Sequence, residues 1–140
     1  MQVRKIDETI SVYGQLEVDD VAAAAEQGFA ALINNRPDGE EPGQPSSAEI
    51  AAAARAAGLD YRYLPLVPGG LDNDIVREFQ TALGDLPGPV LAFCRSGTRS
   101  TTLWAAANAA RLGVDAVIGA AAEAGYDLSG ARPFLTHQAS

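Results

Sequence analysis

One stretch of the sequence decides the predicted fold: Val90-Leu91-Ala92-Phe93-Cys94-Arg95-Ser96-Gly97-Thr98-Arg99-Ser100. Its first four residues are apolar and predict a buried strand that ends on Cys94. The polar loop that follows contains a single glycine and leads into a helix predicted over Arg99–Leu112. In open α/β folds, ligands bind at the carboxyl ends of the parallel strands. The stretch therefore places Cys94 at a candidate binding site.

Apolar runs and helical patterns alternate along the rest of the chain. Strands are predicted over Ile10–Tyr13, Phe29–Ile33, Tyr61–Val67 and Val90–Phe93, and helices over Val21–Gln27, Ala48–Ala57, Asp72–Leu83, Arg99–Leu112 and Asp115–Ala124. Polar sequence rich in Pro and Gly predicts a surface loop over Asn34–Pro45, and Tyr126–Ser140 is predicted to be a loose tail. This alternation indicates an α/β fold of three layers, α/β/α, around a central parallel sheet. We expect a single domain over residues 1–140.

The composition limits the classes of function. The chain of 140 residues has 47% hydrophobic residues and a net charge of −8, so we expect it to repel nucleic acid. No apolar stretch reaches the length of a membrane span, and the amino-terminal residues lack the apolar run of a signal peptide. The single cysteine cannot form an internal disulfide, which favours a reducing, cytoplasmic location.

The loop after the buried strand has the properties of an anion-binding site. A short turn into a helix directs successive backbone N–H groups toward one point and adds the positive end of the helix dipole. Such surroundings stabilise a thiolate, so Cys94 is the predicted nucleophile. Arg99 can bind an oxyanion with two hydrogen bonds, and Ser100 can donate its hydroxyl to the sulfur. The remaining loop residues predicted to contact substrate are Arg95, Ser96, Gly97 and Thr98.

Cys94 has an alternative interpretation as a small buried side chain, as free cysteines often are. The loop beside it contains two arginines and other polar residues, which rarely form a hydrophobic core, so the sequence favours the functional interpretation. Arg36 either lines the same pocket from the loop after the second strand or pairs locally with Asp38 or Glu40. His137 lies in the predicted tail, far from Cys94 in the sequence. We expect no metal site and no cofactor.

Three segments together resemble a known family: Cys94–Trp104, the run Asn34-Asn35-Arg36-Pro37-Asp38, and Tyr126-Asp127-Leu128. They are similar to the DUF442 family, the phosphatase-like domain of beta-lactamase hydrolase-like proteins, whose members are also named as sulfur transferases. The resemblance implies the fold of dual-specificity phosphatases, with a central parallel sheet of four strands. It also implies that Cys94 is the nucleophile and that Cys94–Arg99 is the anion loop. Members occur alone or fused to enzymes of sulfide and persulfide oxidation.

The resemblance leaves the transferred group open between sulfur and phosphoryl. Protein tyrosine phosphatases place five residues between cysteine and arginine, whereas this chain has four between Cys94 and Arg99, closer to the tight loop of rhodanese sulfurtransferases. Phosphatases of this fold also carry an aspartate after the third strand, where this chain has Pro68. Asp72 is the nearest candidate for the general acid, but it also suits the cap of the next helix.

Sulfur transfer needs no general acid, because thiolate and sulfite are good leaving groups. The sequence alone therefore favours a sulfurtransferase that takes sulfane sulfur from thiosulfate or a persulfide through a Cys94 persulfide, with glutathione or another thiol as acceptor. A cysteine-dependent phosphatase is the alternative. A third possibility is an inactive module that binds anions or senses oxidation through Cys94.

Overall fold

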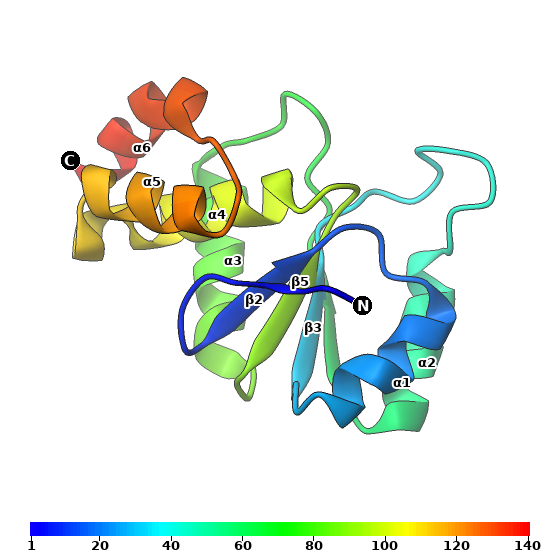
Figure 1. Ribbon diagram of the computed structural model, residues 1–140. Coiled ribbons are helices and arrows are strands. Elements are labelled where there is room, and N and C mark those ends of the chain that lie inside the picture. Colours follow the sequence, from blue (N-terminus) through cyan, green and yellow to red (C-terminus); the bar gives the residue numbers. More distant parts are fainter.

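Four parallel strands form the centre of the computed structural model, which describes residues 1–140 (Figure 1). They are β2 (Ile10–Tyr13), β3 (Ala31–Asn34), β4 (Asp60–Tyr63) and β5 (Val90–Phe93). With β1 (Arg4–Lys5) at the edge, the order across the sheet is β1-β2-β5-β3-β4. The strand that carries the cysteine therefore lies in the middle, with a parallel neighbour on each side.

The register brings the carboxyl ends of the four parallel strands into one row. Phe93 is paired with Tyr13 on one side and with Asn34 on the other, and Asn34 is paired with Tyr63. The loops that follow these strands consequently begin at the same edge of the sheet. This is the edge at which the sequence predicts the site.

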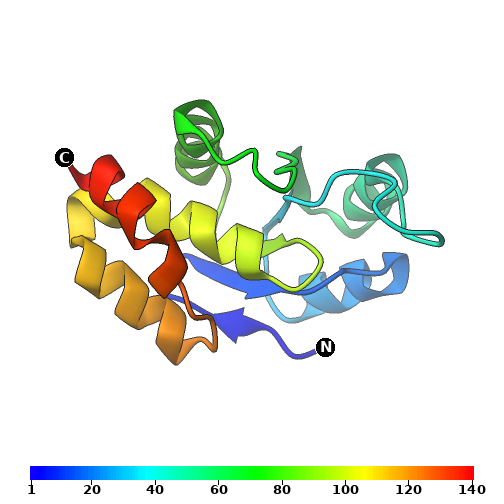
Figure 2. The ribbon, with the colours of Figure 1, turned by 90° about the horizontal axis from the view of Figure 1, so that it is seen from above.

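Helices cover both faces of the sheet, as Figures 1 and 2 show. One face packs against α1 (Val18–Glu26) and α2 (Ser47–Ala57), and the other against α3 (Asn73–Asp85), α4 (Thr98–Leu112), α5 (Val114–Glu123) and α6 (Arg132–Ala139). Successive strand residues point to opposite faces, so Leu91 and Phe93 join the core beneath α1 and α2 while Val90 and Ala92 join the other core. The predicted three-layer α/β/α architecture is confirmed.

Two predictions about the architecture are wrong. The sheet is mixed rather than purely parallel, because β1 pairs antiparallel with β2; a strand of two exposed, charged residues has no apolar pattern to reveal it. The expected loose tail contains a short 3₁₀ turn (Ser129–Ala131) and α6. Its Leu135 is fully buried in the core and α6 packs against α4. Tertiary packing stabilises this helix of eight residues, which has little helical pattern of its own.

Helix α4 holds the site in place. Its buried residues include Trp104, and most of its length is enclosed between the sheet and the neighbouring helices. Gly97 caps its amino end in the left-handed conformation and offers no side-chain acceptor to the first turn. The N–H groups of Arg99 and Ser100 in that turn therefore have no capping side chain. None of the helices combines the length and the apolar character that crossing a membrane requires.

Candidate active site

Cys94 directly follows β5 and lies at the base of the loop, with 1% of its surface exposed. The N–H of Gly97 donates a hydrogen bond to its Sγ over 3.1 Å. This contact requires the backbone to fold back within three residues, which Gly97 permits at φ +95°. The sulfur is thus held on the inner side of the loop.

Several backbone N–H groups of the loop and of the first turn of α4 have no acceptor in the chain. The N–H groups of Gly97 and Thr98 bind the side chains of Cys94 and Ser96. Those that make no hydrogen bond belong to Arg95, Ser96, Arg99 and Ser100. Buried or partly buried N–H groups are rarely left without a partner, and at a helix amino terminus they form a cradle for an anion. The loop therefore has unpaired N–H groups of the kind that an anion-binding site requires, and anion binding by Cys94–Arg99 stays a prediction.

Arg99 is held by Glu40, a residue to which the sequence analysis gave no role at the site. Its Nη1 and Nη2 each donate to one oxygen of the Glu40 carboxylate over 2.8 Å, and Nη1 also donates to the Leu66 carbonyl over 2.8 Å. Arg99 and, more weakly, Arg36 lower the pKa of Glu40 from 4.5 to about 2. The two-pronged hydrogen bonding predicted between Arg99 and a substrate oxyanion is made here with Glu40.

Arg36 lies behind this pair and does not line the substrate pocket. Its guanidinium is 1% exposed and donates to Glu40, Glu41 and the side-chain oxygen of Gln15. Local pairing, the alternative interpretation of Arg36, therefore describes its position. Glu40 is a predicted partner, and Glu41 is a partner that was not predicted. Asp38 does not pair with Arg36. Because a buried guanidinium needs compensating charge, Arg36 fixes the carboxylate that in turn fixes Arg99.

Ser100 and Asp72 also differ from the roles first assigned to them. Ser100 is fully buried, and its hydroxyl donates to Asn35 Oδ1 over 2.8 Å rather than to the Cys94 sulfur. Asp72 caps α3, where its carboxylate accepts the N–H of Ile75. The segment that leads to it, residues 64–71, contains no acidic side chain. The geometry therefore supports the capping interpretation of Asp72.

The other loop side chains point away from the core. Arg95 has a largely exposed side chain that comes within 3.9 Å of Glu41, and the hydroxyls of Ser96 and Thr98 hydrogen-bond to each other. Tyr126 packs against the loop: its hydroxyl donates to the Ser96 carbonyl over 3.1 Å. The sequence analysis quoted Tyr126 only within the family resemblance. No pattern in the sequence links it to a loop that lies 30 positions away.

The fold and the site define a phosphatase-like α/β domain with a cysteine–arginine loop at the carboxyl edge of its sheet. The family described as "Beta-lactamase hydrolase-like protein, phosphatase-like domain" matches residues 2–111, and the chain belongs to it. The beta-lactamase hydrolase-like protein of Agrobacterium fabrum is 40% identical over 104 residues, which cover 74% of this chain and 24% of that protein. The chain thus spans about a quarter to a third of the length of the curated relatives it matches.

Solved structures agree with this assignment. A phosphatase candidate from Neisseria meningitidis Z2491 superposes with a TM-score of 0.89 at 34% identity, over 99% of both chains. The active form of the phosphatase Tk-PTP superposes with a TM-score of 0.66 over 98% of this chain and 95% of that one. At 18% identity it shows the fold alone. The dual-specificity-phosphatase-like fold implied by the family resemblance is confirmed.

Proposed function

We propose that this domain is a cysteine-dependent phosphatase, which hydrolyses a phosphoric ester through a phosphocysteine at Cys94. The observation that carries the proposal is the set of loop N–H groups without acceptors beside the Cys94 sulfur and Arg99. Such donors suit the equatorial oxygens of a phosphoryl group in transfer. The phosphatase-like family supports the same chemistry and reverses the order that the sequence alone favoured.

The reaction follows from these positions. The Cys94 thiolate attacks phosphorus, the bond from phosphorus to the ester oxygen breaks, and the alcohol leaves as its anion. Water then attacks the phosphocysteine, the P–S bond breaks, and phosphate and the thiolate are released with a proton. Residues 64–71 supply no acid to protonate the leaving oxygen. The proposed substrates are therefore esters whose leaving groups are stable as anions, such as aryl phosphates.

Sulfur transfer is the second candidate, on the strength of one observation. Four residues separate Cys94 from Arg99, one fewer than in protein tyrosine phosphatases, and a tighter loop suits a smaller group. In this reaction the thiolate attacks the sulfane sulfur of thiosulfate and releases sulfite. The resulting persulfide passes its outer sulfur to a thiol such as glutathione. A reducing, cytoplasmic compartment would suit either reaction, because it keeps the thiol free.

The test measures both reactions on one preparation. Hydrolysis of p-nitrophenyl phosphate and sulfur transfer from thiosulfate are followed in parallel, with Cys94→Ser as the control for both. We expect phosphate release that Cys94→Ser abolishes, and a phosphocysteine trapped by rapid acid quench and mass spectrometry. A faster sulfur transfer with a persulfide on Cys94 would instead establish the second candidate. Anion binding without either turnover would leave an inactive binding module.

A further inference from the structure

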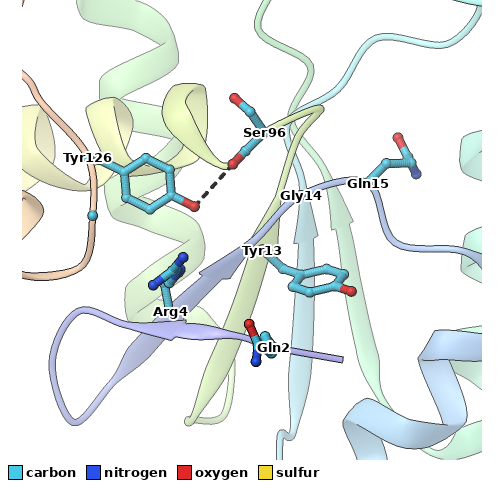
Figure 3. A pocket seen from close by; sticks show the side chains of 8 residues that line it. Gln2, Arg4, Tyr13, Gly14, Gln15, Ser96 and Tyr126 are labelled. Atoms are coloured by element: carbon cyan, nitrogen blue, oxygen red, sulfur yellow. Dashed lines mark hydrogen bonds between the residues drawn. The ribbon is translucent and has the colours of Figure 1, made fainter.

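A pocket lies on the outer side of the catalytic loop, where the sequence analysis expected none. Its volume is about 410 Å³, within the range of small-molecule sites. It is lined by Gln2, Arg4, Tyr13–Gln15, Ser96 and Gly125–Tyr126, as Figure 3 shows. None of these residues is acidic, although the chain carries 18 Asp and Glu residues. The pocket is therefore polar with a positive charge.

Arg4 supplies that charge, and its side chain makes no ion pair or hydrogen bond within the chain. The arginines of the catalytic region, by contrast, all have a carboxylate within 4.0 Å: Arg36, Arg95 and Arg99. A Cβ atom added to Gly125 would lie 3.8 Å from Cζ and Nη1 of Arg4, so the guanidinium is placed directly beside this glycine. The Gln2 side-chain amide also lines this pocket and likewise has no hydrogen-bond partner, whereas the Tyr13 hydroxyl points away from Arg4 (Figure 3).

The pocket is separate from the cradle that faces Cys94. The carbonyls of Arg95 and Ser96 accept hydrogen bonds from Gln15 N and Tyr126 Oη on the outer side of the loop. In a trans peptide the carbonyl and the following N–H point in opposite directions, so the N–H groups of Ser96 and Gly97 point inward, and that of Gly97 binds the Cys94 sulfur. One loop thus forms the wall between two positive sites.

Tyr126 connects the two sites. Its hydroxyl binds the Ser96 carbonyl, and its ring lies against Gly97, whose added Cβ would approach Tyr126 Cζ to 2.8 Å. Burial raises the pKa of Tyr126; the charge of Cys94 raises it further, and the charge of Arg4 lowers it. The phenol is therefore within electrostatic reach of both the nucleophile and the unpaired guanidinium.

We propose that this outer pocket is a second anion-binding site, which takes a phosphate or carboxylate group on Arg4 and is coupled to the catalytic loop through Tyr126. The anion is either free in solution or a second charged group of a larger ligand. Arg4 and Gln2 offer the donors, and the rest of the pocket accommodates a small organic part. The proposal does not depend on which group Cys94 transfers.

Two-dimensional NMR of the intact chain, titrated with inorganic phosphate, tests this site. Saturable shifts are expected at the amides of Gly125 and Tyr126 in addition to those at Thr98 and Arg99. Arg4→Ala should weaken the Gly125 response about tenfold, because it removes a charge-assisted hydrogen bond, and should leave the Arg99 response in place. Arg99→Ala should do the reverse. Arg55→Ala is the matched control, since Arg55 is an exposed arginine without a side-chain partner on α2.

Two further measurements identify the source of the anion and test the coupling between the outer pocket and the catalytic loop. The first compares the affinities of a linear bisphosphate and of phosphate. If the bisphosphate binds more tightly in the wild type but not in Arg4→Ala, the outer pocket takes a second charged group of one ligand. If the wild type binds both equally well, the pocket takes a free anion. Tyr126→Phe is made in the Arg99→Ala background, so that phosphate does not bind at the catalytic loop itself. It should keep phosphate in the pocket and abolish the response of Gly97 to it. The site is refuted if phosphate shifts only loop residues or if Arg4→Ala binds like Arg55→Ala. The coupling is refuted if Tyr126→Phe leaves the Gly97 response unchanged.

Discussion

Glu40 binds Arg99 with both carboxylate oxygens across 59 positions of sequence, at 2.8 Å for each N–O pair. The same carboxylate accepts a hydrogen bond from the buried Arg36, so one acidic side chain is held between two guanidiniums. The arrangement fixes the Arg99 guanidinium against Glu40 and the Leu66 carbonyl before any substrate binds. It also means that the arginine's terminal nitrogens are already engaged, which leaves much of the oxyanion binding to the backbone N–H groups.

Glu40→Gln should lower the free energy of unfolding by about 1–3 kcal/mol, the range for hydrogen bonds to charged groups. The reason is that Glu40 pairs with both Arg36 and Arg99, so its replacement weakens two ion pairs, whereas Glu41→Gln weakens only the pair with Arg36. Urea denaturation measures the change. Glu41→Gln is the control, because Glu41 is about half exposed and does not contact Arg99, and it should cost under about 1 kcal/mol. Equal losses in both variants would contradict the central position of Glu40.

Acid should destabilise the protein partly through Glu40. Its pKa is lowered to about 2 in the folded state from 4.5, so its contribution is complete above pH 4.5 and disappears as the pH falls toward 2. The wild type should therefore lose more stability between pH 5 and pH 2 than Glu40→Gln, which has no carboxylate to protonate at this position. Melting temperatures at matched ionic strength compare the two proteins. Parallel curves would show that another group governs acid unfolding.

Arg99→Ala should reduce kcat by about 10²-fold, because loss of its contacts to Glu40 and the Leu66 carbonyl lets the catalytic loop shift, and a displacement of about 1 Å costs that much. Arg99→Lys should be nearly as damaging, because an ammonium cannot engage both Glu40 oxygens and the Leu66 carbonyl in the same plane. Steady-state kinetics with an aryl phosphate provide the measurement. Arg95→Ala is the comparison: its exposed side chain should affect mainly KM. A larger loss of kcat in Arg95→Ala than in Arg99→Ala would show that Arg95, and not Arg99, is the more important arginine for turnover.

Gly97→Ala should be the most damaging glycine substitution in the chain. The residue has φ +95°, and its new Cβ would overlap the hydroxyl end of Tyr126. We expect a loss of about 1–3 kcal/mol of stability from the backbone conformation alone, together with loss of turnover. Gly119→Ala in α5 is the control, since no atom lies within 4 Å of its added Cβ; it should be neutral or stabilise by up to about 1 kcal/mol. A fully active Gly97→Ala enzyme would contradict this loop geometry.

The central part of the fold can be predicted from the sequence because its physical causes are local. Val90–Phe93 is apolar throughout since both of its faces are covered, and a cysteine followed by a polar, glycine-containing turn reveals the site. The caps at Ser46 and Asp72 are likewise local, since each side chain binds an N–H group three residues away. These features depend on a few consecutive residues, and the structure agrees with them.

The parts that could not be predicted depend on contacts between distant segments. Glu40 and Glu41 lie side by side in a polar loop, and nothing in the sequence distinguishes the one that meets Arg99. Strand β1 contains only two exposed residues, and α6 is stabilised by packing on α4. The position of Tyr126 over the catalytic loop follows from how α5 ends, which has no signature in the residues themselves.

Strand β1 also affects how this domain behaves at high concentration. An uncovered sheet edge offers its backbone groups to strands of other molecules and so promotes aggregation. Here β1 occupies the edge of β2, yet it is too short to offer a long template itself, and it presents Arg4 and Lys5 to solvent. Lys5 is paired with Glu8, but the unpaired charge of Arg4 on so short a strand opposes the approach of a second copy. Strand β1, which contributes Arg4 to the outer pocket, thereby also limits aggregation through the edge of the sheet.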